Sequence, residues 1–317
     1  MRWRARPVGI LAGFLADLVF ADPSRRHPVA GFGRCASGLE SHTYRDSRIA
    51  GTAHTAVLVG VLAAAGTVLQ RRVPDGAGAA VLTGAAVWMA LGGTTLGRTG
   101  SAMADRLSDG DIDGARDLLP SLCGRDPSAL DAAGLARAAC ESVAENTSDA
   151  QVAPLLWAAL AGVPGVLAYR AINTLDAMIG HRSTHYARFG WAAARSDDIA
   201  NYIPARLTGV LTAVCAPMIG GSTPGALRAW RRDASRHPSP NAGVPEAAFA
   251  GALGVRLGGP TQYRHELEIR PTLGDGTAPT PEELRRAVRL SRLVRAAALV
   301  VALAFSVVGP SVQRRRA

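Results

Sequence analysis

Long apolar stretches alternate with polar, arginine-rich stretches along this chain of 317 residues. Two of them, residues 51–70 and 77–97, suffice to cross a bilayer, which takes about 20 mostly apolar residues. Pro74, Asp75 and Gly76 between them predict a tight turn. We therefore expect a spanning helical hairpin over residues 51–97, with the regions before and after it on one side of the membrane.

Two further apolar stretches, residues 152–167 and 203–219, are short and interrupted by proline and glycine. Broken segments of this kind often line a cavity at membrane depth, although ordinary buried helices have the same pattern. Re-entrant or buried segments here would let the polar parts of the chain meet on one side.

A last apolar stretch, residues 293–309, follows a strongly basic helix. Thr280 and Glu283 predict a capping box at the start of that helix, with Pro281 at its first position. Its arginines suit an anionic membrane surface, and a solvated basic face is the alternative.

The predicted fold is all-α, a polytopic helical membrane protein with broken apolar helices. Asp131 is the expected N-cap of the last helix in the polar insert. We expect one integral membrane domain over residues 1–317, divided as follows: the hairpin at 51–97, a polar helical insert at 98–149, a core site region at 138–260, and the basic amphipathic helix with the last membrane segment at 280–310.

The first 21 residues imitate a signal peptide, with Val19 and Ala21 at a cleavage-like position. Asp17 interrupts the apolar stretch. The polar motif that follows Ala21 is also more specific than we expect at the start of a secreted mature protein. We therefore expect this segment to belong to the folded protein.

The amino-acid composition excludes several classes of function. All 35 basic residues are arginine, and the net charge is +10. Without lysine, the chain has neither a Walker A loop nor a pyridoxal Schiff base. Aromatic residues make up 5% and the arginines are spread through loops, so nucleic-acid binding explains the charge less well than positive loops beside a membrane. The four cysteines form no C-x-x-C motif, which argues against a zinc site or a disulfide framework.

A stripe of acids adjoins the first broken segment. Glu141, Glu145 and Asp149 are spaced i, i+4, i+8, so a helix would place them on one face. Like charges at this spacing repel each other by a few tenths of a kcal/mol, roughly. Such a stripe, with Asn146 beside it, predicts that the carboxylates have a catalytic or ligand-binding role.

A second polar set follows the first broken segment. Tyr169, Asn173 and Asp176 share one face of a predicted helix. Asp198 and Asn201 share a face of the next. Ionisable groups near the membrane interior are costly and by default functional.

Two further polar blocks complete the candidate site. The block "DPSRRHPVAGFGR" contains His27 and Arg34, and the proline-rich loop "HPSPNAGVPE" contains His237, Asn241 and Glu246. The prolines predict a rigid irregular loop. Such a loop either holds binding groups or is merely structural.

Hard cations such as Mg²⁺ take carboxylate oxygens and share phosphate oxygens with a substrate. The carboxylates offered for this are Glu141, Glu145, Asp149, Asp176 and Asp198. Arginines can clamp phosphate in a bidentate manner, and the candidates are Arg170, Arg195 and Arg206. Intrahelical ion pairs, Arg137 with Glu141 and Arg195 with Asp198, are the simpler interpretation.

Four stretches together resemble a known family of integral membrane proteins, adenosylcobinamide-phosphate synthase (cobinamide synthase) of cobalamin biosynthesis. They are "DPSRRHPVAGFGR", "CESVAENTSDAQVAPLLWAALAGVPGVLAYRAINTLDAMIG", "YARFGWAAARSDDIANYIPARLTGVL" and "HPSPNAGVPEAAFAGALGVRLGG". The resemblance covers most of the chain, whereas residues 98–139 contribute little. It implies an ATP-dependent ligase that joins adenosylcobyric acid to aminopropanol or its O-phosphate, through an acyl phosphate and with Mg²⁺.

Under this resemblance the residues receive hypothetical roles. The metal and nucleotide ligands are Glu141, Glu145, Asp149 and Asp198, and the catalytic group adds Asn146 and Asp176. Substrate binding falls to His27, Arg34, Tyr169, Asn173, Arg195, Asn201, Arg206, His237, Asn241 and Glu246.

The expected location is the cell membrane, in several passes, with the active site on the cytoplasmic side where ATP is. Expected partners are the corrinoid, the amino alcohol and membrane lipid, with a homo-oligomer or other cobalamin-pathway enzymes as further possibilities and no nucleic acid. A membrane transporter with a midplane site and a membrane-bound sensor or regulatory protein are the alternative functions.

Overall fold

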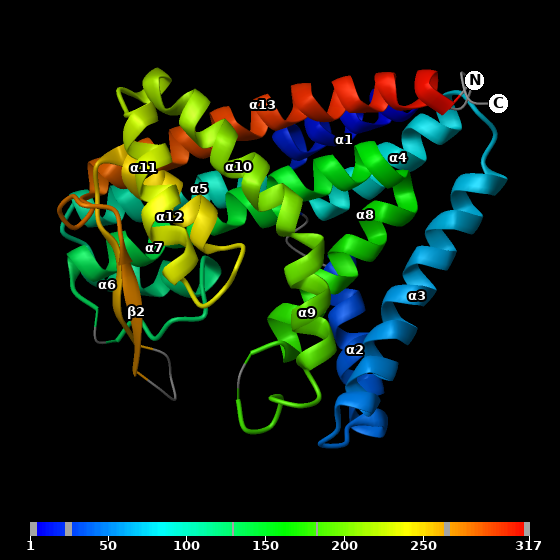
Figure 1. Ribbon diagram of the computed structural model, residues 1–317, viewed down its shortest axis with the longest axis horizontal. Helices are drawn as coiled ribbons and strands as arrows, with labels where there is room; N and C mark the ends of the chain where they lie inside the picture. The colour runs from blue at the N-terminus through cyan, green and yellow to red at the C-terminus, as the bar shows by residue number, and fades with distance from the viewer. Residues whose placement is uncertain (1–4, 23–26, 129, 182, 263–266, 314–317) are drawn as a thin grey trace. The chain divides into compact units, whose positions relative to one another are not determined.

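The computed structural model describes residues 5–22, 27–128, 130–181, 183–262 and 267–313. Nearly all of the regular structure in these ranges is helical, as the sequence predicts (Figure 1). Five helical stretches are long and apolar enough to cross a membrane, which confirms a polytopic helical membrane protein: Arg48–Arg72, Ala77–Ser108, Ala132–Ile179, Tyr202–Ile219 and Pro281–Val307.

The chain forms two compact units. Unit 1 comprises residues 1–92, 153–201 and 298–317, and unit 2 comprises residues 93–152 and 202–297. Each is described by itself below.

Unit 1 is built on two tightly packed sets of helices. The first set is α1 against α4, and the second is α3, α8, α9 and α2. Their bounds are Ala5–Phe20 for α1, Pro28–Thr43 for α2, Arg48–Arg72 for α3, Ala77–Ala90 for α4, Ala153–Ile179 for α8 and Trp191–Ala200 for α9. The two helices of the expected hairpin, α3 and α4, follow one another across the turn, but α3 packs mainly on α8 whereas α4 packs mainly on α1.

Helix α1 and helix α4 approach closely through glycine. A methyl group at Gly13 would lie 2.6 Å from the carbonyl oxygen of Gly84, and one at Gly9 would lie 2.7 Å from that of Ala80. Small residues allow such approach where lipid supplies no hydrophobic driving force between helices. Asp17 is fully buried in α1, so this segment is packed into unit 1.

Helix α8 contains the break that the sequence predicts. Gly162 has φ 67° and ψ −149°, and Pro164 follows it. The freed backbone groups are satisfied by side chains of other helices: the Val163 N–H donates to Gln70 Oε1 at 2.9 Å, and Arg6 donates to the Ala159 carbonyl at 3.1 Å. A broken helix is tolerated at membrane depth when neighbours supply such partners.

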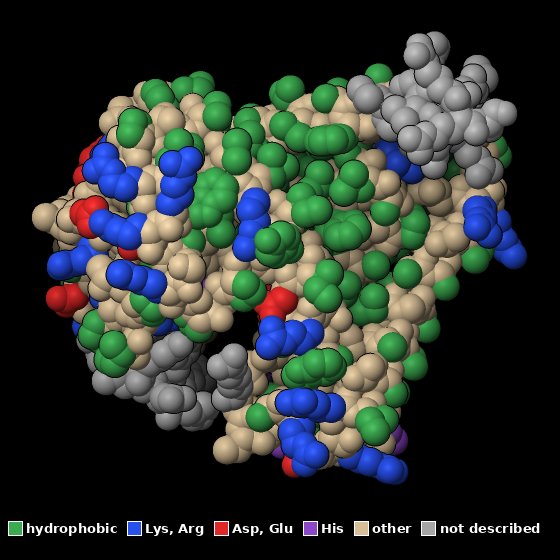
Figure 2. All heavy atoms as spheres, viewed as in Figure 1, with side chains coloured by type: hydrophobic (Ala, Val, Ile, Leu, Met, Phe, Trp, Pro, Cys, Tyr) green, Lys and Arg blue, Asp and Glu red, His purple; other side chains and the backbone are tan. Residues whose placement is uncertain are grey.

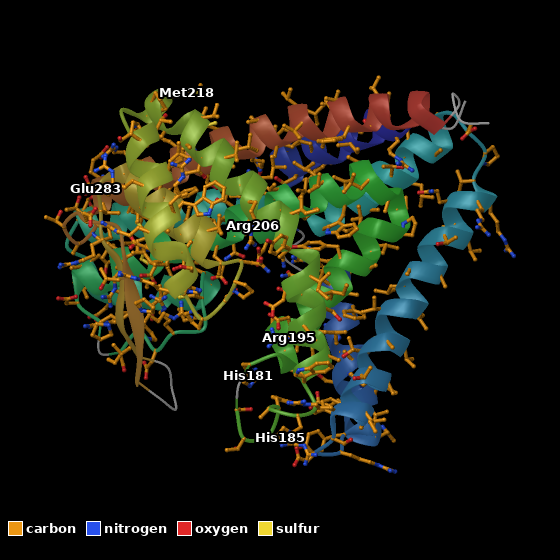
Figure 3. The ribbon with its side chains drawn as sticks, in the orientation of Figure 1. His181, His185, Arg195, Arg206, Met218 and Glu283 are labelled. Carbon is orange, nitrogen blue, oxygen red and sulfur yellow. The ribbon has the colours of Figure 1, made fainter. Side chains whose placement is uncertain are left out.

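Apolar and basic side chains occupy different parts of unit 1. Large apolar side chains stay exposed along α3, among them Val57, Val61 and Val68, as expected of a surface that meets lipid. Figure 2 shows basic side chains gathered at the end of unit 1 where α2 and α9 lie. There His185 holds the loop between α8 and α9 by stacking on Tyr44, with 4.1 Å between the ring centroids. Figure 3 labels His185 in this loop.

Unit 2 packs its helices around α7, α10 and α12. The helices are α5 (Gly93–Ser108), α6 (Ile112–Leu118), α7 (Ala132–Thr147), α10 (Tyr202–Cys215), α11 (Thr223–Asp233), α12 (Gly243–Leu253) and α13 (Pro281–Gln313), whose later part belongs to unit 1. Short helical turns are η1 (Leu119–Ser121), η2 (Ser148–Val152), η3 (Ala216–Ile219) and η4 (Ala234–Arg236). Turn η2 is π-helical, a form that occurs frequently at functional sites.

A two-stranded antiparallel hairpin in unit 2 was not predicted. Strand β1 (Leu257–Gln262) pairs with β2 (Leu267–Leu273), with Gly259 opposite Arg270. The register is irregular between Leu257 and Gly259. Strand β1 is rich in glycine and shows no alternation, and in β2 apolar and polar residues alternate only from Leu267 to Arg270 before Pro271 interrupts the pattern, which is too short to indicate a strand by itself.

The two predicted helix starts are confirmed. Asp131 caps α7 by accepting from the Gly134 N–H at 2.8 Å. At the start of α13 the Thr280 N–H donates to Glu283 Oε2 at 3.0 Å, and the Thr280 hydroxyl accepts from the Glu282 N–H.

The arginines of α13 are engaged within unit 2. Arg285 donates to Asp105 and Ser108, and Arg286 reaches the carbonyl oxygens that end η3 and α12. Arg295, which is buried, donates to Thr94 Oγ1 at 3.2 Å. Protein groups therefore hold these three side chains, whereas Arg289 and Arg292 of the same helix are exposed.

The glycine contact between α1 and α4 can be tested with Gly13→Ala. Because the added methyl overlaps the α4 backbone, we expect a loss of about 1–3 kcal/mol of stability. Gly60→Ala in α3 is the matched control, because nothing lies within 4 Å of its added methyl. Thermal midpoints in detergent measure both, and equal midpoints would contradict the close packing.

Candidate functional site

The acidic stripe lies in unit 2, and its first member is anchored on both sides. Glu141 is buried, and its Oε2 accepts from Arg125. Its Oε1 accepts from the Gly258 N–H of the hairpin at 2.6 Å. Arg137 instead donates to the carbonyls of Gly258 and Pro260. The intrahelical pair of Arg137 with Glu141 is therefore wrong: Glu141 is paired with the polar insert and the hairpin.

Glu145 stands apart from this arrangement. It is half-buried, and within the described part of the chain its carboxylate makes no hydrogen bond. The charges of Arg270, Arg125 and Glu141 act on it. Glu145 is thus the member of the stripe whose oxygens stay available to a ligand.

The third acid, Asp149, falls in the π-helical turn η2. The i→i+5 bonding of that turn shifts its direction from the spacing that an α-helix would give. Asn146 turns back on its own helix, where its amide donates to the Ser142 carbonyl at 3.0 Å.

The proline-rich loop and α12 bring a buried acid close to the stripe. Glu246 is 1% exposed, and its Oε1 lies 3.6 Å from His237 Nε2. Burial raises the pKa of the Glu246 carboxyl well above its usual value, and the charges of Glu141 and Glu145 raise it further. Three glutamates and two arginines, Arg125 and Arg270, thus form one interacting cluster in unit 2.

Asn241 from the same loop pairs with α10. Its Oδ1 accepts from Arg206 at 2.6 Å, and the Arg206 guanidinium stacks 3.7 Å over the Tyr202 ring. Figure 3 labels Arg206 on α10. The loop is therefore fixed by side chains that the sequence marked as candidates.

In unit 1 the second polar set, which includes Tyr169, Asn173 and Asn201, forms a chain of side-chain contacts between α8 and α9. The Tyr169 hydroxyl donates to Asn201 Oδ1 at 2.9 Å, and both residues are buried. Asn173 donates to Asp197 Oδ1 at 3.4 Å. This contact places Asp197, which the sequence analysis did not single out, in the site.

Two other candidates of this set are placed differently. Arg195 and Asp198 form the simple i, i+3 ion pair, with 2.9 Å between Nη1 and Oδ2. Asp176 is half-buried near the end of α8.

An open pocket of about 380 Å³ in unit 1 lies between the block "DPSRRHPVAGFGR", here called the first block, and the polar part of α8. Its charged members are Asp22, His27 and Arg170, and His27 Nε2 lies 3.8 Å from Asp22 Oδ1. Arg34 is exposed on α2 and does not line this pocket. Arg25 and Arg26 of the first block lie outside the described residues.

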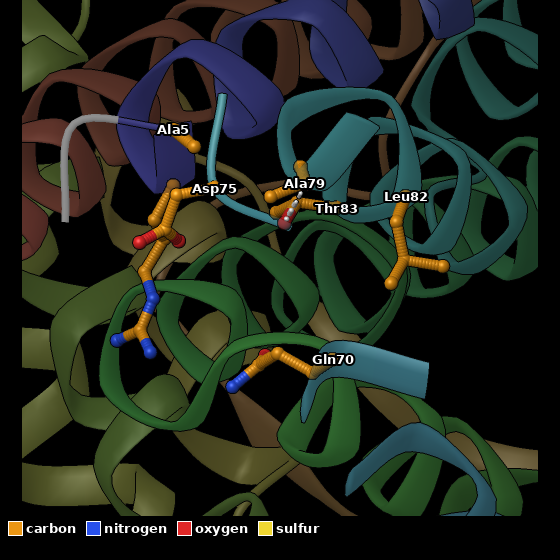
Figure 4. A pocket seen from close by; sticks show the side chains of 7 residues that line it. Ala5, Gln70, Asp75, Ala79, Leu82 and Thr83 are labelled. Atoms are coloured by element: carbon orange, nitrogen blue, oxygen red, sulfur yellow. Dashed lines mark hydrogen bonds between the residues drawn. The ribbon is translucent and has the colours of Figure 1, made fainter. Parts of the chain in front are cut away.

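A second pocket in unit 1, of about 170 Å³, lies beside the break in α8. Figure 4 shows Gln70, Asp75 and Thr83 among the side chains that line it, and Arg6 belongs to the same lining. Because Arg6 and Gln70 also bond the freed backbone of α8, this pocket is accounted for by the helix break.

The predicted metal ligands do not assemble into a cage of protein groups. Among the described residues, no group of three or more His, Cys, Asp or Glu side chains is placed to hold a metal ion. Asp198 belongs to unit 1, whereas Glu141, Glu145 and Asp149 belong to unit 2. Both oxygens of Glu141 are already bonded.

Sequence reasoning missed three charged residues that the structure brings to the clusters. Arg125 lies in the insert that contributed little to the resemblance, and Arg270 lies on the unpredicted strand β2. No pattern in the neighbouring sequence could predict that Arg125 and Arg270 lie close to the acids of α7. Asp197 had a usable signal, because it is four residues before Asn201 and so shares its helix face.

Comparison with known proteins agrees with the resemblance seen in the sequence. The family model described as CobD/Cbib protein matches residues 10–291. A "Cobalamin biosynthesis protein CobD" of Mycobacterium tuberculosis is 64% identical over 301 residues, which are 95% of this chain and 96% of that protein. Proteins of the same name from Geobacter metallireducens and Rhodobacter capsulatus are 42% and 43% identical, over 85% and 87% of this chain and 87% and 88% of their own.

No solved structure matches the chain. The family model spans most of the sequence, including all four polar blocks and both clusters of site residues. The chain belongs to the CobD/CbiB family of proteins.

Proposed function

We propose that this chain acts in cobalamin biosynthesis as an ATP-dependent ligase of the cell membrane, joining adenosylcobyric acid to aminopropanol or its O-phosphate. Family membership supports the role in cobalamin biosynthesis. The observation that supports the ligase chemistry is the cluster of three glutamates and two arginines in unit 2, of which Glu141, Glu246 and Arg125 are buried.

The proposed reaction has two steps. The carboxylate of the corrinoid attacks the γ-phosphorus of ATP, which gives an acyl phosphate and releases ADP. The amine nitrogen then attacks the acyl carbon, the C–N bond forms, inorganic phosphate leaves, and the nitrogen gives up a proton. The product is an amide, and one ATP is consumed for each bond formed.

The charge cluster suits the first step. A transferring phosphoryl group spreads negative charge over its oxygens, and preformed cations stabilise that charge without reorganisation. Arg125 and Arg270 are such cations. Without lysine in the chain, a Walker A loop cannot supply this charge, so arginine takes its place.

Glu145 is the proposed ligand for the metal of the nucleotide complex. Mg²⁺ usually keeps several waters and takes one or two protein carboxylates beside the substrate phosphates. The half-buried Glu145 carboxylate offers one such ligand. Glu141, with both oxygens bonded inside the protein, serves to position the cluster instead.

The proposed location follows the same reasoning. ATP is cytoplasmic, so the cluster of glutamates and arginines in unit 2 would face the cytoplasm. The long apolar helices make lipid an obligatory surrounding for this protein.

A product assay tests the ligase directly. Purified protein in detergent receives adenosylcobyric acid, aminopropanol O-phosphate, ATP and Mg²⁺, and mass spectrometry follows the amide. We expect ATP-dependent product from the wild type and a loss of about 100-fold or more in Glu145→Gln, the scale typical of a lost electrostatic group.

The matched control is Glu282→Gln, an exposed glutamate in the first turn of α13, which should keep full activity. If the wild type and Glu145→Gln form equal amounts of product, the ligase activity is supported but the role of Glu145 as metal ligand is wrong. Absence of product, together with substrate flux into sealed vesicles, would instead favour the transporter.

Glu246 gives a prediction on pH. Its pKa is raised in the folded state, so its proton stabilises the fold at low pH, and that contribution is lost as pH rises from the unfolded value of about 4.3 toward the folded value. We expect Glu246→Gln to flatten the fall of the thermal midpoint over this range. An unchanged slope would show that His237 or another partner keeps the carboxyl ionised.

A further inference from the structure

The open pocket of unit 1 has walls of mixed charge. It lies where the start of α2 faces the second half of α8. Its lining consists of Asp22, His27, Val29, Ala30, Gly33, Arg170 and Thr174. The pocket therefore offers a carboxylate, an imidazole, a guanidinium and a hydroxyl within one small space of about 380 Å³.

The cationic side of this pocket suits a phosphate. A guanidinium carries five donors in a planar fork that matches phosphate oxygens. His27 Nδ1 accepts from the Val29 N–H at 3.1 Å, so the ring proton is assigned to Nε2, which is the atom on the side of Asp22. The positive end of the 16-residue helix α2 adds to the same potential.

Arg170 is oriented by contacts behind it. Its Nη1 donates to Asn173 Oδ1 at 3.3 Å, and Asn173 in turn donates to Asp197 at 3.4 Å. Thr174 bonds back to the Arg170 carbonyl at 2.7 Å. This chain of contacts from α8 and α9 helps to position the half-buried guanidinium at the wall of the pocket.

The anionic side suits an ammonium group. Asp22 is half-buried, with 27% of its side chain exposed. A carboxylate in such a place stabilises a cation more strongly than one in bulk water. A pocket with both kinds of wall matches a small molecule that carries both charges.

We propose that this pocket is the subsite for the amine substrate and binds a short aminoalkyl phosphate, with the phosphate against Arg170 and His27 and the ammonium against Asp22. The inference rests on the proposed function for the identity of the substrate. The volume suits a small molecule. A corrinoid, which is far larger, would have to bind elsewhere.

Direct titration tests the subsite without any turnover. Isothermal titration of the full chain in detergent, with neither ATP nor corrinoid, uses aminopropanol O-phosphate as the probe. Isopropyl phosphate lacks the amine, and aminopropanol lacks the phosphate. We expect both to bind the wild type about 10- to 100-fold more weakly than the complete zwitterion, as a lost charge-assisted contact implies.

Two variants assign the contacts. Arg170→Gln should weaken the zwitterion and isopropyl phosphate alike. Asp22→Asn should weaken the zwitterion but leave isopropyl phosphate unchanged. The matched controls are Arg72→Gln and Asp46→Asn, both exposed and outside the pocket, which should bind all three probes as the wild type does.

The outcomes separate this inference from the proposed function. Ligation with an unchanged KM for the amine in both Arg170→Gln and Asp22→Asn would overturn the subsite and keep the ligase. Binding that is lost in the variants, in a protein that forms no amide, would keep the subsite and overturn the ligase. If the folded wild type binds no probe, the subsite is wrong.

Discussion

The buried ion pair of Glu141 with Arg125 is the interaction on which the arrangement of unit 2 depends. A buried charge is tolerated only when it is paired and hydrogen-bonded, and Glu141 also takes the N–H of Gly258, which has φ 80°. Removing one partner of such a pair leaves the other uncompensated, at a cost of about 3–5 kcal/mol. One carboxylate thereby joins α7, the polar insert and the hairpin, and it fixes the helix from which Glu145 projects.

In unit 1 the corresponding constraint is the broken backbone of α8. Unpaired backbone groups are costly away from water, and Gln70 and Arg6 remove that cost at Gly162. The break lies before the part of α8 that carries Tyr169, Arg170 and Asn173. Gly162 and Pro164 therefore come shortly before the polar face, and the break and the polar face belong to the same helix.

Local interactions were predictable from the sequence, and long-range ones were not. The caps at Asp131 and Thr280, the break at Gly162 and the apolar spans follow from residues within a few positions of each other. The partner of Glu141 lies 16 residues away and that of Asn173 lies 24 away, where spacing gives no geometric information. The acidic stripe was predicted as one face of an α-helix, whereas its last member, Asp149, falls in the π-helical turn η2, and no residue pattern announces such a turn.

Arg295 has a consequence for how the chain is inserted during synthesis. It lies near the start of the apolar stretch at 293–309, is buried, and is held by the hydroxyl of Thr94 on α5. A charged side chain within a membrane segment opposes insertion unless protein groups pair with it, and arginine cannot lower this cost by losing its proton. Since α5 is synthesised before α13, the hydroxyl already exists when the arginine leaves the ribosome. We therefore expect stable insertion of α13 to depend on a helix made 201 residues earlier.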